Sequence, residues 1–266
     1  MIKKYTLYDE LKSEKELIDF LTKRESQIRN NSCSRENIVL SALGNPSQDE
    51  KDKLLDYGCG WGYISRRAAE SGWEVTGIDI SENEISIAQL MYKHENTGSK
   101  IIYSTDTIDS FPEKYFDAVI STEVIEHVHN PGLYLSRINR VLKNNGKLII
   151  SIPNIMTINN VFNHLYKTFT EGLLKTSQKI HSHYDKAHIH INSWDAFHFT
   201  QFVSSVGFLL DEFRPMEHRP LPRHLACLRK PFFQKIFNKT LRLQPLRRSM
   251  LFKFSKIEDK IILPYE

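Results

Sequence analysis

One short stretch, "STEVIEHVHNPG" (121–132), has the side chains needed for acid–base or metal chemistry. Glu123, Glu126 and His127 are spaced i, i+3 and i+4, so in a helical turn they would share one face. Two carboxylates and an imidazole can bind a divalent cation such as Mg²⁺ or Zn²⁺. Without a metal, His127 can act as a general base beside a substrate hydroxyl. A structural alternative is that Glu126 and His127 only anchor the turn by hydrogen bonds.

Histidines are concentrated in a second stretch, "HSHYDKAHIH" (181–190), which holds four of them in ten residues. Any single histidine there would more often lie on the surface, but the group favours a position near a site. The stretch ends a long connection without regular alternation, about residues 154–190. A connection of that length is typical of a lid over a binding site.

Three glycines follow an apolar run in "LLDYGCGWGYIS" (54–65). Glycine lets backbone N–H groups approach a ligand closely where a β-carbon would collide. Asp79 comes nineteen residues after Gly60, at the end of the next apolar run, where a carboxylate can accept both hydroxyls of a ribose. The alternative for Asp79 is a helix cap, but Ser81 and Glu84 already have the spacing of a capping box.

Strands and helices alternate around these motifs. The apolar runs predict strands at 53–57, 73–80, 100–105, 116–122 and 147–153, with two further antiparallel strands at 208–216 and 224–230. Periodicity and caps predict helices at 9–29, 63–71, 81–94, 131–143 and 193–207. This alternation favours an α/β fold with a mainly parallel sheet and helices on both faces. Ligands of such sheets bind beyond the carboxyl ends of the strands.

The composition bounds the class of protein. With 266 residues and 40% hydrophobic content, the chain can bury the core of one large globular domain with embellishments. The basic start is not followed by the apolar stretch of a signal peptide, and no run approaches the ~18 apolar residues of a membrane span. Three widely spaced cysteines fit a reducing compartment, so we expect a cytoplasmic protein.

Charge is unevenly distributed although the net charge is only +4. Residues 218–257 contain eleven Lys and Arg and no acidic residue. This segment is a solvated face or a dimer contact, or it binds an anionic membrane surface or a nucleic acid. Apolar residues interleaved with the basic ones favour peripheral contact with the inner face of the membrane, although aromatic rings can also stack on bases; they are Phe232, Phe233, Phe237, Leu251, Phe252 and Phe254.

Taken in order, the motifs resemble those of the class I S-adenosylmethionine-dependent methyltransferases. The resemblance is carried by "LLDYGCGWG", "GIDIS", "YSTDTI", "FDAVISTEVIEHVHNPG" and "VLKNNGKLIISIPN", about residues 50–155. The D-x-G-x-G-x-G spacing of the first motif differs from the G-x-G-x-x-G of dinucleotide sites. Tyr57 departs from the small aliphatic residue usual there. The resemblance implies a Rossmann-like seven-stranded sheet and S-adenosylmethionine as the cofactor.

The resemblance also implies which residues would hold the cofactor. Gly58, Gly60 and Gly62 would line its methionine part, and Asp56 would hold its amino group through the loop. Asp79 would bind the ribose.

Around the adenine and the methyl group, the resemblance implies five further residues. Ile80 would pack on the adenine, and Asp106 with the backbone of Thr107 would face the adenine amino group. Thr122 and Glu123 would border the methyl group. For Asp106, the alternative is a plain turn residue.

The E-x-x-E-H pattern is similar to that of two families with a bound metal, the ubiquinone-pathway O-methyltransferases and the small-RNA 3′-terminal 2′-O-methyltransferases. In the RNA family a histidine some sixty residues later completes the site. His188 lies at a similar distance, with His190, His183 and His181 as competitors. The metal set implied by the resemblance is therefore Glu123, Glu126, His127 and one of these histidines, His188 first.

From these observations we predict an N-terminal helical extension (1–48), a methyltransferase domain (49–230) with a lid at 154–190, and a basic amphipathic appendage (231–266). The expected reaction is methylation of a hydroxyl on a small-molecule, lipid-linked or glycan acceptor, with Glu123, Glu126 and His127 as catalytic residues. RNA 2′-O-methylation is the first alternative, and a non-catalytic cofactor-binding protein is the second. The second is disfavoured because all three of these residues are present.

Overall fold

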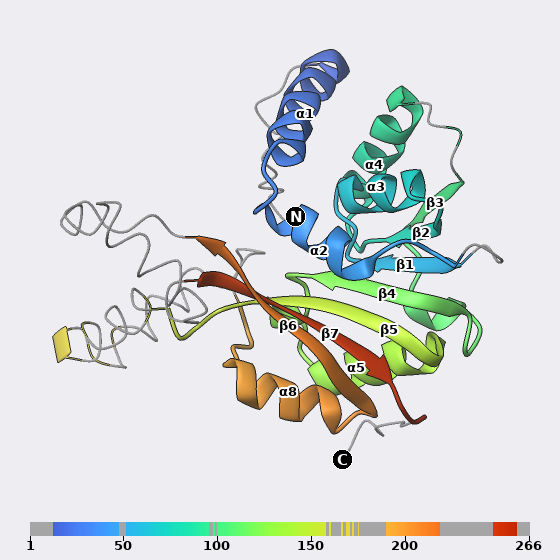
Figure 1. Ribbon diagram of the computed structural model, residues 1–266. Coiled ribbons are helices and arrows are strands. Elements are labelled where there is room, and N and C mark those ends of the chain that lie inside the picture. Colours follow the sequence, from blue (N-terminus) through green and yellow to red (C-terminus); the bar gives the residue numbers. More distant parts are fainter. Residues whose placement is uncertain are drawn as a thin grey trace. The chain divides into compact units, whose positions relative to one another are not determined.

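The computed structural model describes residues 13–47, 52–95, 98, 100–157, 160, 166, 169–170, 172, 175, 190–218 and 247–259 (Figure 1). The chain divides into two compact units. Unit 1 comprises Met1–Ser121 and Val141–Lys147, and unit 2 comprises Thr122–Arg140 and Leu148–Glu266.

A seven-stranded sheet with the order β3-β2-β1-β4-β5-β7-β6 forms the framework of the fold. Its strands are β1 (Lys53–Tyr57), β2 (Glu74–Ile78), β3 (Ile101–Ser104), β4 (Phe116–Thr122), β5 (Leu142–Pro153), β6 (Phe208–His218) and β7 (Arg247–Lys256). β1 pairs in parallel with β2 and β4, β2 pairs in parallel with β3, and β6 and β7 are antiparallel. The predicted seven-stranded, mainly parallel sheet is confirmed.

Strand order reverses at β1, because β2 and β3 lie on one side of it and β4 on the other. Parallel pairing brings the carboxyl ends of β1, β2 and β3 to one edge, and ligands bind at such an edge in open α/β sheets. Of the residues predicted to bind the cofactor, Asp56 lies within β1 and Thr122 ends β4, and the others follow β1, β2 or β3.

Among its described residues, unit 1 has the α-helices α1 (Glu14–Arg29), α2 (Arg35–Leu43), α3 (Tyr63–Glu70) and α4 (Glu82–Glu95). α1 confirms the helix expected at 9–29 over its described part, and the Ser13 side chain caps it by accepting from the Glu16 N–H at 3.3 Å. α2 was not predicted. Its amino end is capped by Ser34, whose hydroxyl accepts the Asn37 N–H.

In unit 2, α5 (Pro131–Val141) and α8 (Ala196–Ser204) are the described helices. The helix expected to run to "NNG" at 144–146 instead ends at Val141, and β5 begins at Leu142. Asn145 has a φ of 62°, so the backbone bends within the strand there and not at a helix end. α8 begins at a cap formed by Asp195, whose side chain accepts the Phe197 and His198 N–H groups.

The last strand corrects the predicted domain plan. We expected the seventh strand at 224–230 and a separate appendage from residue 231, but β7 is Arg247–Lys256 and pairs with β6. Four of its apolar side chains are buried: Met250, Leu251, Phe252 and Phe254. The last three were expected to favour a membrane surface, and they are instead part of the core. The mixed basic and apolar sequence predicts a surface feature, but in β7 the apolar side chains pack into the sheet.

Residues 219–246 and the histidines at 181–188 lie outside the described residues, as does most of the predicted lid. Among the helices that the structure describes, none has the length and apolar character needed to cross a membrane. The predicted domain boundary at residue 48 stays a prediction.

Candidate active site

The glycine turn after β1 is held by the neighbouring strand. The N–H groups of Gly58 and Cys59 both donate to the carbonyl of Ile78 at the end of β2, at 2.8 and 3.1 Å. All three glycines of the turn have positive φ angles, of 81°, 50° and 77° for Gly58, Gly60 and Gly62. A side chain would be strained at each of these positions, which explains why the sequence uses glycine.

Gly60 and Gly62 differ in the room that their surroundings leave for a side chain. A β-carbon on Gly62 would lie 2.6 Å from the Tyr103 hydroxyl and 3.0 Å from the Ala88 β-carbon, so Gly62 is needed for packing of the helix start. A β-carbon on Gly60 would meet only Glu84 Oε2, at 3.8 Å. The backbone of Gly60 therefore faces open space, as a ligand-binding turn requires.

Asp79 and Ile80 follow β2. Asp79 accepts hydrogen bonds from the Gly60 N–H (3.0 Å, Oδ2) and the Ser81 N–H (2.9 Å, Oδ1), which ties the glycine turn to the start of α4. Each carboxylate oxygen has a further lone pair for a ligand hydroxyl. Next to it, the Ile80 side chain is 98% exposed, an unusual state for isoleucine and a suitable surface for a flat ring.

Asp56 is a buried residue among those predicted to hold the cofactor. It is 1% exposed and accepts a 2.6 Å hydrogen bond from the Ser65 hydroxyl of α3. Burial raises its pKa to about 6; the Ser65 hydrogen bond opposes this, and the charge of Asp79 adds to it. Its contact with α3 fits the expected indirect role, in which it supports the loop from beneath.

Asp106 and Thr107 follow β3 and are exposed. The Asp106 N–H donates to the Ser104 hydroxyl at 3.4 Å, and Thr107 begins the short 3₁₀ turn Ile108–Ser110. Their position at the carboxyl end of β3 agrees with the role implied for them, which remains a prediction.

Glu84 is a residue that sequence reasoning missed as part of this site, because its spacing from Ser81 marked it as half of a capping box. The Ser81 hydroxyl does accept the Glu84 N–H at 3.3 Å. The Ser81 N–H, however, donates to Asp79 and not back to Glu84. The Glu84 carboxylate instead lies close to the open side of Gly60, and burial together with the charge of Asp79 raises its pKa.

In unit 2 the acidic residues do not lie on one helical face as predicted. Glu123 has a φ of 55° and precedes a 3₁₀ turn, η2 (Ile125–His127), so the i, i+3, i+4 geometry of an α-helix does not apply. The Glu123 carboxylate accepts the Ser151 hydroxyl at 3.0 Å, and its N–H donates to the Ser151 carbonyl at 3.1 Å. Thr122, predicted to border the methyl group, is half-buried at the end of β4.

η2 instead brings together Glu126, His127 and His190. One ligand atom from each lies within 4.8 Å of the others. Glu126 is buried at 1% exposure, and the two imidazole rings lie 5.0 Å apart between centroids. His190 is an exposed residue, but partial desolvation of its ring and the neighbouring His127 lower its pKa, which favours the neutral imidazole that can bind a metal or accept a proton.

Backbone contacts hold His190 in this position. The N–H groups of Ile191 and Asn192 both donate to the Glu126 carbonyl, at 2.8 and 2.9 Å, and the Asn192 side chain donates to the Val128 carbonyl at 2.5 Å. Of the four histidines considered as the later ligand, the structure therefore places His190 beside η2. His181, His183 and His188 lie outside the described residues, and Glu123 is not a member of this group.

A family described as "Methyltransferase domain" matches residues 27–212, more than half of the chain. The chain belongs to this methyltransferase family. The match includes the glycine turn, η2 and His190. The match begins within α1.

Curated relatives of this methyltransferase domain are ubiquinone biosynthesis O-methyltransferases. The protein from Dechloromonas aromatica is 36% identical over 105 residues, covering 38% of this chain and 44% of the relative. The protein from Rickettsia conorii is 41% identical over 105 residues, covering 39% of this chain and 36% of the relative. The chain thus spans about half or less of the length of the curated relatives it matches.

Solved structures resemble the methyltransferase domain along most of its length. A protein from Bacillus halodurans described as a putative methyltransferase has a TM-score of 0.57 at 16% identity, covering 84% of this chain and 99% of its own. An S-adenosylmethionine-dependent methyltransferase from Archaeoglobus fulgidus has a TM-score of 0.54 at 17% identity, covering 90% and 100%. A [4+2]-cyclase, SpnF, matches with a TM-score of 0.56 at 15% identity, covering 91% and 94%. These similarities establish the class I methyltransferase fold, and the cyclase illustrates that the fold alone does not define an activity.

Proposed function

We propose that the protein transfers a methyl group from S-adenosylmethionine to a hydroxyl of a small-molecule or lipid-linked acceptor. The observation that carries the cofactor half of this proposal is the pairing of Asp79 with a fully exposed Ile80 beside the open glycine turn. A carboxylate for ribose hydroxyls and an apolar surface for a flat base are thus adjacent at the end of β2. This arrangement is chemically suited to a nucleoside.

The residues present fit the cofactor. The open side of Gly60 leaves its backbone accessible, and the acidic side chains of Asp79 and Glu84 near it suit a cationic group such as an amino group or a sulfonium. Exposed Asp106 and Thr107 can offer polar atoms to a base edge at the end of the next strand. When bound, S-adenosylmethionine supplies an electrophilic methyl group on a sulfonium.

The chain's own contribution to chemistry would then be to orient the two partners and to move one proton. Glu126, His127 and His190 form the group suited to that task. As a base, the imidazole of His127 or His190 would take the hydroxyl proton of the acceptor. As metal ligands, the three side chains would hold a cation that lowers the pKa of that hydroxyl.

A more specific version of this proposal is that Glu126, His127 and His190 bind a metal ion. Two imidazoles and a carboxylate are typical ligands of Zn²⁺ or a similar transition metal, and are less typical of Mg²⁺, which prefers oxygen ligands. The separation of the three ligand atoms, at most 4.8 Å, is compatible with convergence on one ion.

A phenolic hydroxyl is the acceptor we propose first, since the curated relatives are named for ubiquinone biosynthesis O-methylation. A hydroxyl of a cell-surface glycan unit is the second acceptor class. RNA 2′-O-methylation stays an alternative, because a later histidine beside η2, His190, is also compatible with the site implied by that resemblance.

Methyl transfer from labelled S-adenosylmethionine to simple catechols, to glycan acceptors and to short RNA tests the proposal. Product should form with one small-molecule class. Chelation should abolish it if the metal form is right, and Zn²⁺ or Mn²⁺ should restore it. Activity that is indifferent to chelation but lost in His127→Ala favours the general base. If the purified protein neither binds the cofactor nor labels any acceptor, the proposal is wrong.

Peripheral membrane contact and a cytoplasmic location stay proposals. Three of the six apolar residues that favoured a membrane surface, Leu251, Phe252 and Phe254, are buried in β7. What still supports membrane contact is the basic sequence between residues 219 and 246. Sedimentation with anionic vesicles, compared with neutral ones, tests it.

A further inference from the structure

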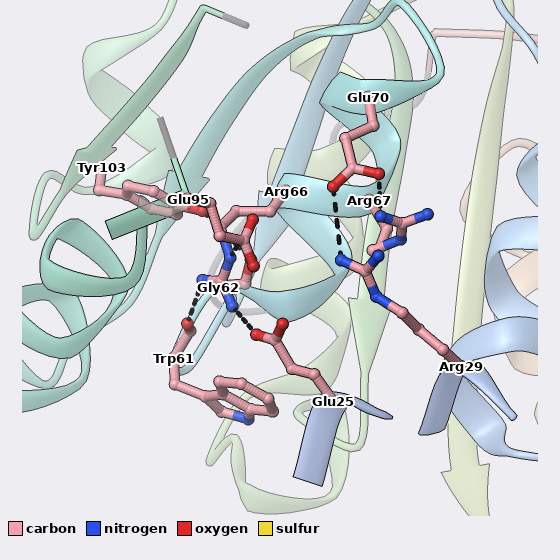
Figure 2. Close-up of polar contacts among 9 residues, drawn as sticks. All are labelled: Glu25, Arg29, Trp61, Gly62, Arg66, Arg67, Glu70, Glu95 and Tyr103. Carbon is pink, nitrogen blue, oxygen red and sulfur yellow. Dashed lines mark hydrogen bonds and ion pairs between the residues drawn. The ribbon is translucent and has the colours of Figure 1, made fainter. Parts of the chain in front are cut away.

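Unit 1 contains a cluster of buried charges that the cofactor proposal does not use. Arg66 of α3 is 1% exposed and pairs with Glu25 of α1 and, at 3.2 Å, with Glu95 at the end of α4 (Figure 2). Glu25 is 5% exposed. One guanidinium thus joins α3 to α4 and to the distant α1.

Arg66 also reaches the glycine turn. Its Nη1 donates a 2.9 Å hydrogen bond to the carbonyl of Trp61, the residue between Gly60 and Gly62 (Figure 2). The guanidinium lies 5.5 Å from the centre of the Trp61 ring. The orientation of the Trp61 peptide, and with it the backbone on both sides, is therefore fixed by a side chain that α1 holds.

The Trp61 ring adds a second link to α1. It packs against a buried cluster formed by Leu21 of α1 with Ile87 and Met91 of α4. The guanidinium of Arg24, also of α1, lies over the Trp61 ring at 5.7 Å from its centre, a cation–π contact. α1 thus contacts the turn through an apolar side chain as well as through the buried charge.

Stability alone is a weak reason for such a cluster. Buried ion pairs are expensive to desolvate, and apolar residues of similar volume often stabilise a protein as well or better. A guanidinium offers five donors in a fixed plane, so it can bind two carboxylates and a carbonyl at once and hold their relative positions. The contacts of Arg66 are therefore better suited to holding the glycine turn in one conformation than to raising the free energy of unfolding.

We propose that Glu25 and Arg66 are positioning residues for the cofactor turn, so that docking of α1 sets the affinity of the glycine turn for its ligand. The inference rests on the proposed function, because it takes the turn to bind an adenosyl cofactor. It adds that α1, which contributes no side chain to the predicted cofactor contacts, is required for tight binding.

The same pair of helices provides a matched control. Arg29 of α1 pairs with Glu70 of α3 at 3.6 Å, and Glu70 also pairs with Arg67 (Figure 2). This second network joins α1 to α3 as the first does, but it is partly exposed and makes no contact with the glycine turn among its described interactions. Substitution of Glu70 therefore changes a contact between α1 and α3 but leaves the hydrogen bond from Arg66 to the Trp61 carbonyl in place.

The experiment is calorimetric titration of the full chain with S-adenosylhomocysteine, alongside thermal unfolding of each variant. We expect Glu25→Gln to weaken binding about ten-fold, since coupling between two sites commonly reaches this size. Glu70→Gln should bind within about two-fold of wild type. Val39→Ala, a core change in α2, should lower the melting temperature and leave the affinity unchanged, which separates positioning from stability. Equal affinity of Glu25→Gln and wild type overturns the inference.

Two further measurements cover other outcomes. If Glu25→Gln does not fold, Glu25→Asp keeps the charge but shortens its reach, and it should still weaken binding more than Glu70→Gln. In wild type, reciprocity requires that ligand binding slow amide hydrogen exchange in α1 more than in α2. Absence of that protection also overturns the inference. If wild type itself does not bind S-adenosylhomocysteine, the proposed function fails instead.

Discussion

Asp56 illustrates how a buried carboxyl group can oppose stability at neutral pH. Its folded-state pKa of about 6 lies above the value of ~3.9 for an unfolded aspartate. Its contribution to stability is therefore fully present below about pH 4 and is lost as the pH rises through about 6. At neutral pH the chain therefore bears the desolvation cost of a buried carboxylate, a cost that a neutral side chain at this position would not have.

We predict that Asp56→Asn removes this pH dependence. The asparagine oxygen can still accept the Ser65 hydroxyl, so the fold should persist. Relative to wild type, the free energy of unfolding of the variant should rise by about 1 kcal/mol between pH 5 and pH 8. Urea unfolding of both proteins at the two pH values measures this change. If the difference in unfolding free energy between variant and wild type is the same at pH 5 and pH 8, the raised pKa of Asp56 is wrong.

The glycines of the turn give a second residue-scale prediction. Gly62→Ala should cost about 2–4 kcal/mol of unfolding free energy, since its β-carbon meets the Tyr103 hydroxyl at 2.6 Å in addition to the backbone strain. Gly60→Ala should cost about 1 kcal/mol, because space is open there. It should nevertheless weaken S-adenosylhomocysteine binding by about ten-fold or more, because the methyl group covers the backbone that the ligand approaches.

Thermal unfolding and calorimetric titration of both variants test this contrast. The reverse order of stability would show that the two positions have been assigned wrongly. A Gly60→Ala protein that binds the ligand as wild type does would remove this turn from the cofactor site.

At the scale of elements, η2 and the segment 190–192 act as one unit. The segment is held by two backbone donors to the Glu126 carbonyl and by the Asn192 side chain on the Val128 carbonyl. Because His190 starts this segment, its approach to His127 depends on these hydrogen bonds and not on the local sequence around either histidine.

We predict that Asn192→Ala weakens metal binding or methyl transfer without unfolding the protein. One lost hydrogen bond costs about 1 kcal/mol of local stability, which allows the segment to move away from η2. Co²⁺ titration followed by visible absorption measures the affinity for the metal. Thr200→Ala, which loses a hydroxyl bonded to the Ala196 carbonyl within α8, is the control and should behave as wild type. If Asn192→Ala matches it, these hydrogen bonds do not maintain the site.

For the whole molecule, β7 decides how much of the C-terminal sequence is part of the fold. It completes the sheet beside β6 and buries Phe252 and Phe254, each worth about 3–5 kcal/mol against truncation to alanine. Their combined value is comparable to the total stability of a typical domain, about 5–15 kcal/mol.

A chain that ends at residue 246 should therefore not fold. We expect aggregation on expression and no cooperative unfolding transition, whereas the full chain should be soluble and unfold cooperatively. Size-exclusion chromatography and circular dichroism distinguish the two. A soluble, cooperatively unfolding protein ending at 246 would mean that the tail is an appendage, as first predicted.

The sequence by itself determined the first six strands and most of the described helices, though neither α2 nor β7, because the signals for them are local. Alternating apolar runs specify strands, and the glycines, Asp79 and Ile80 each stand within five residues of a strand end. A parallel sheet then brings those ends to one edge. The acidic pattern at 123–127 was also visible, but the helical face inferred from it was wrong because Glu123 has a positive φ.

Tertiary structure alone decided which distant residues meet. His190 joins His127 from 63 positions away, Glu25 reaches Arg66 across 41, and β7 occupies the place expected for an earlier segment. No local periodicity encodes these choices. They depend on which pairing buries the most apolar surface and satisfies the buried polar groups, a property of the whole packed chain.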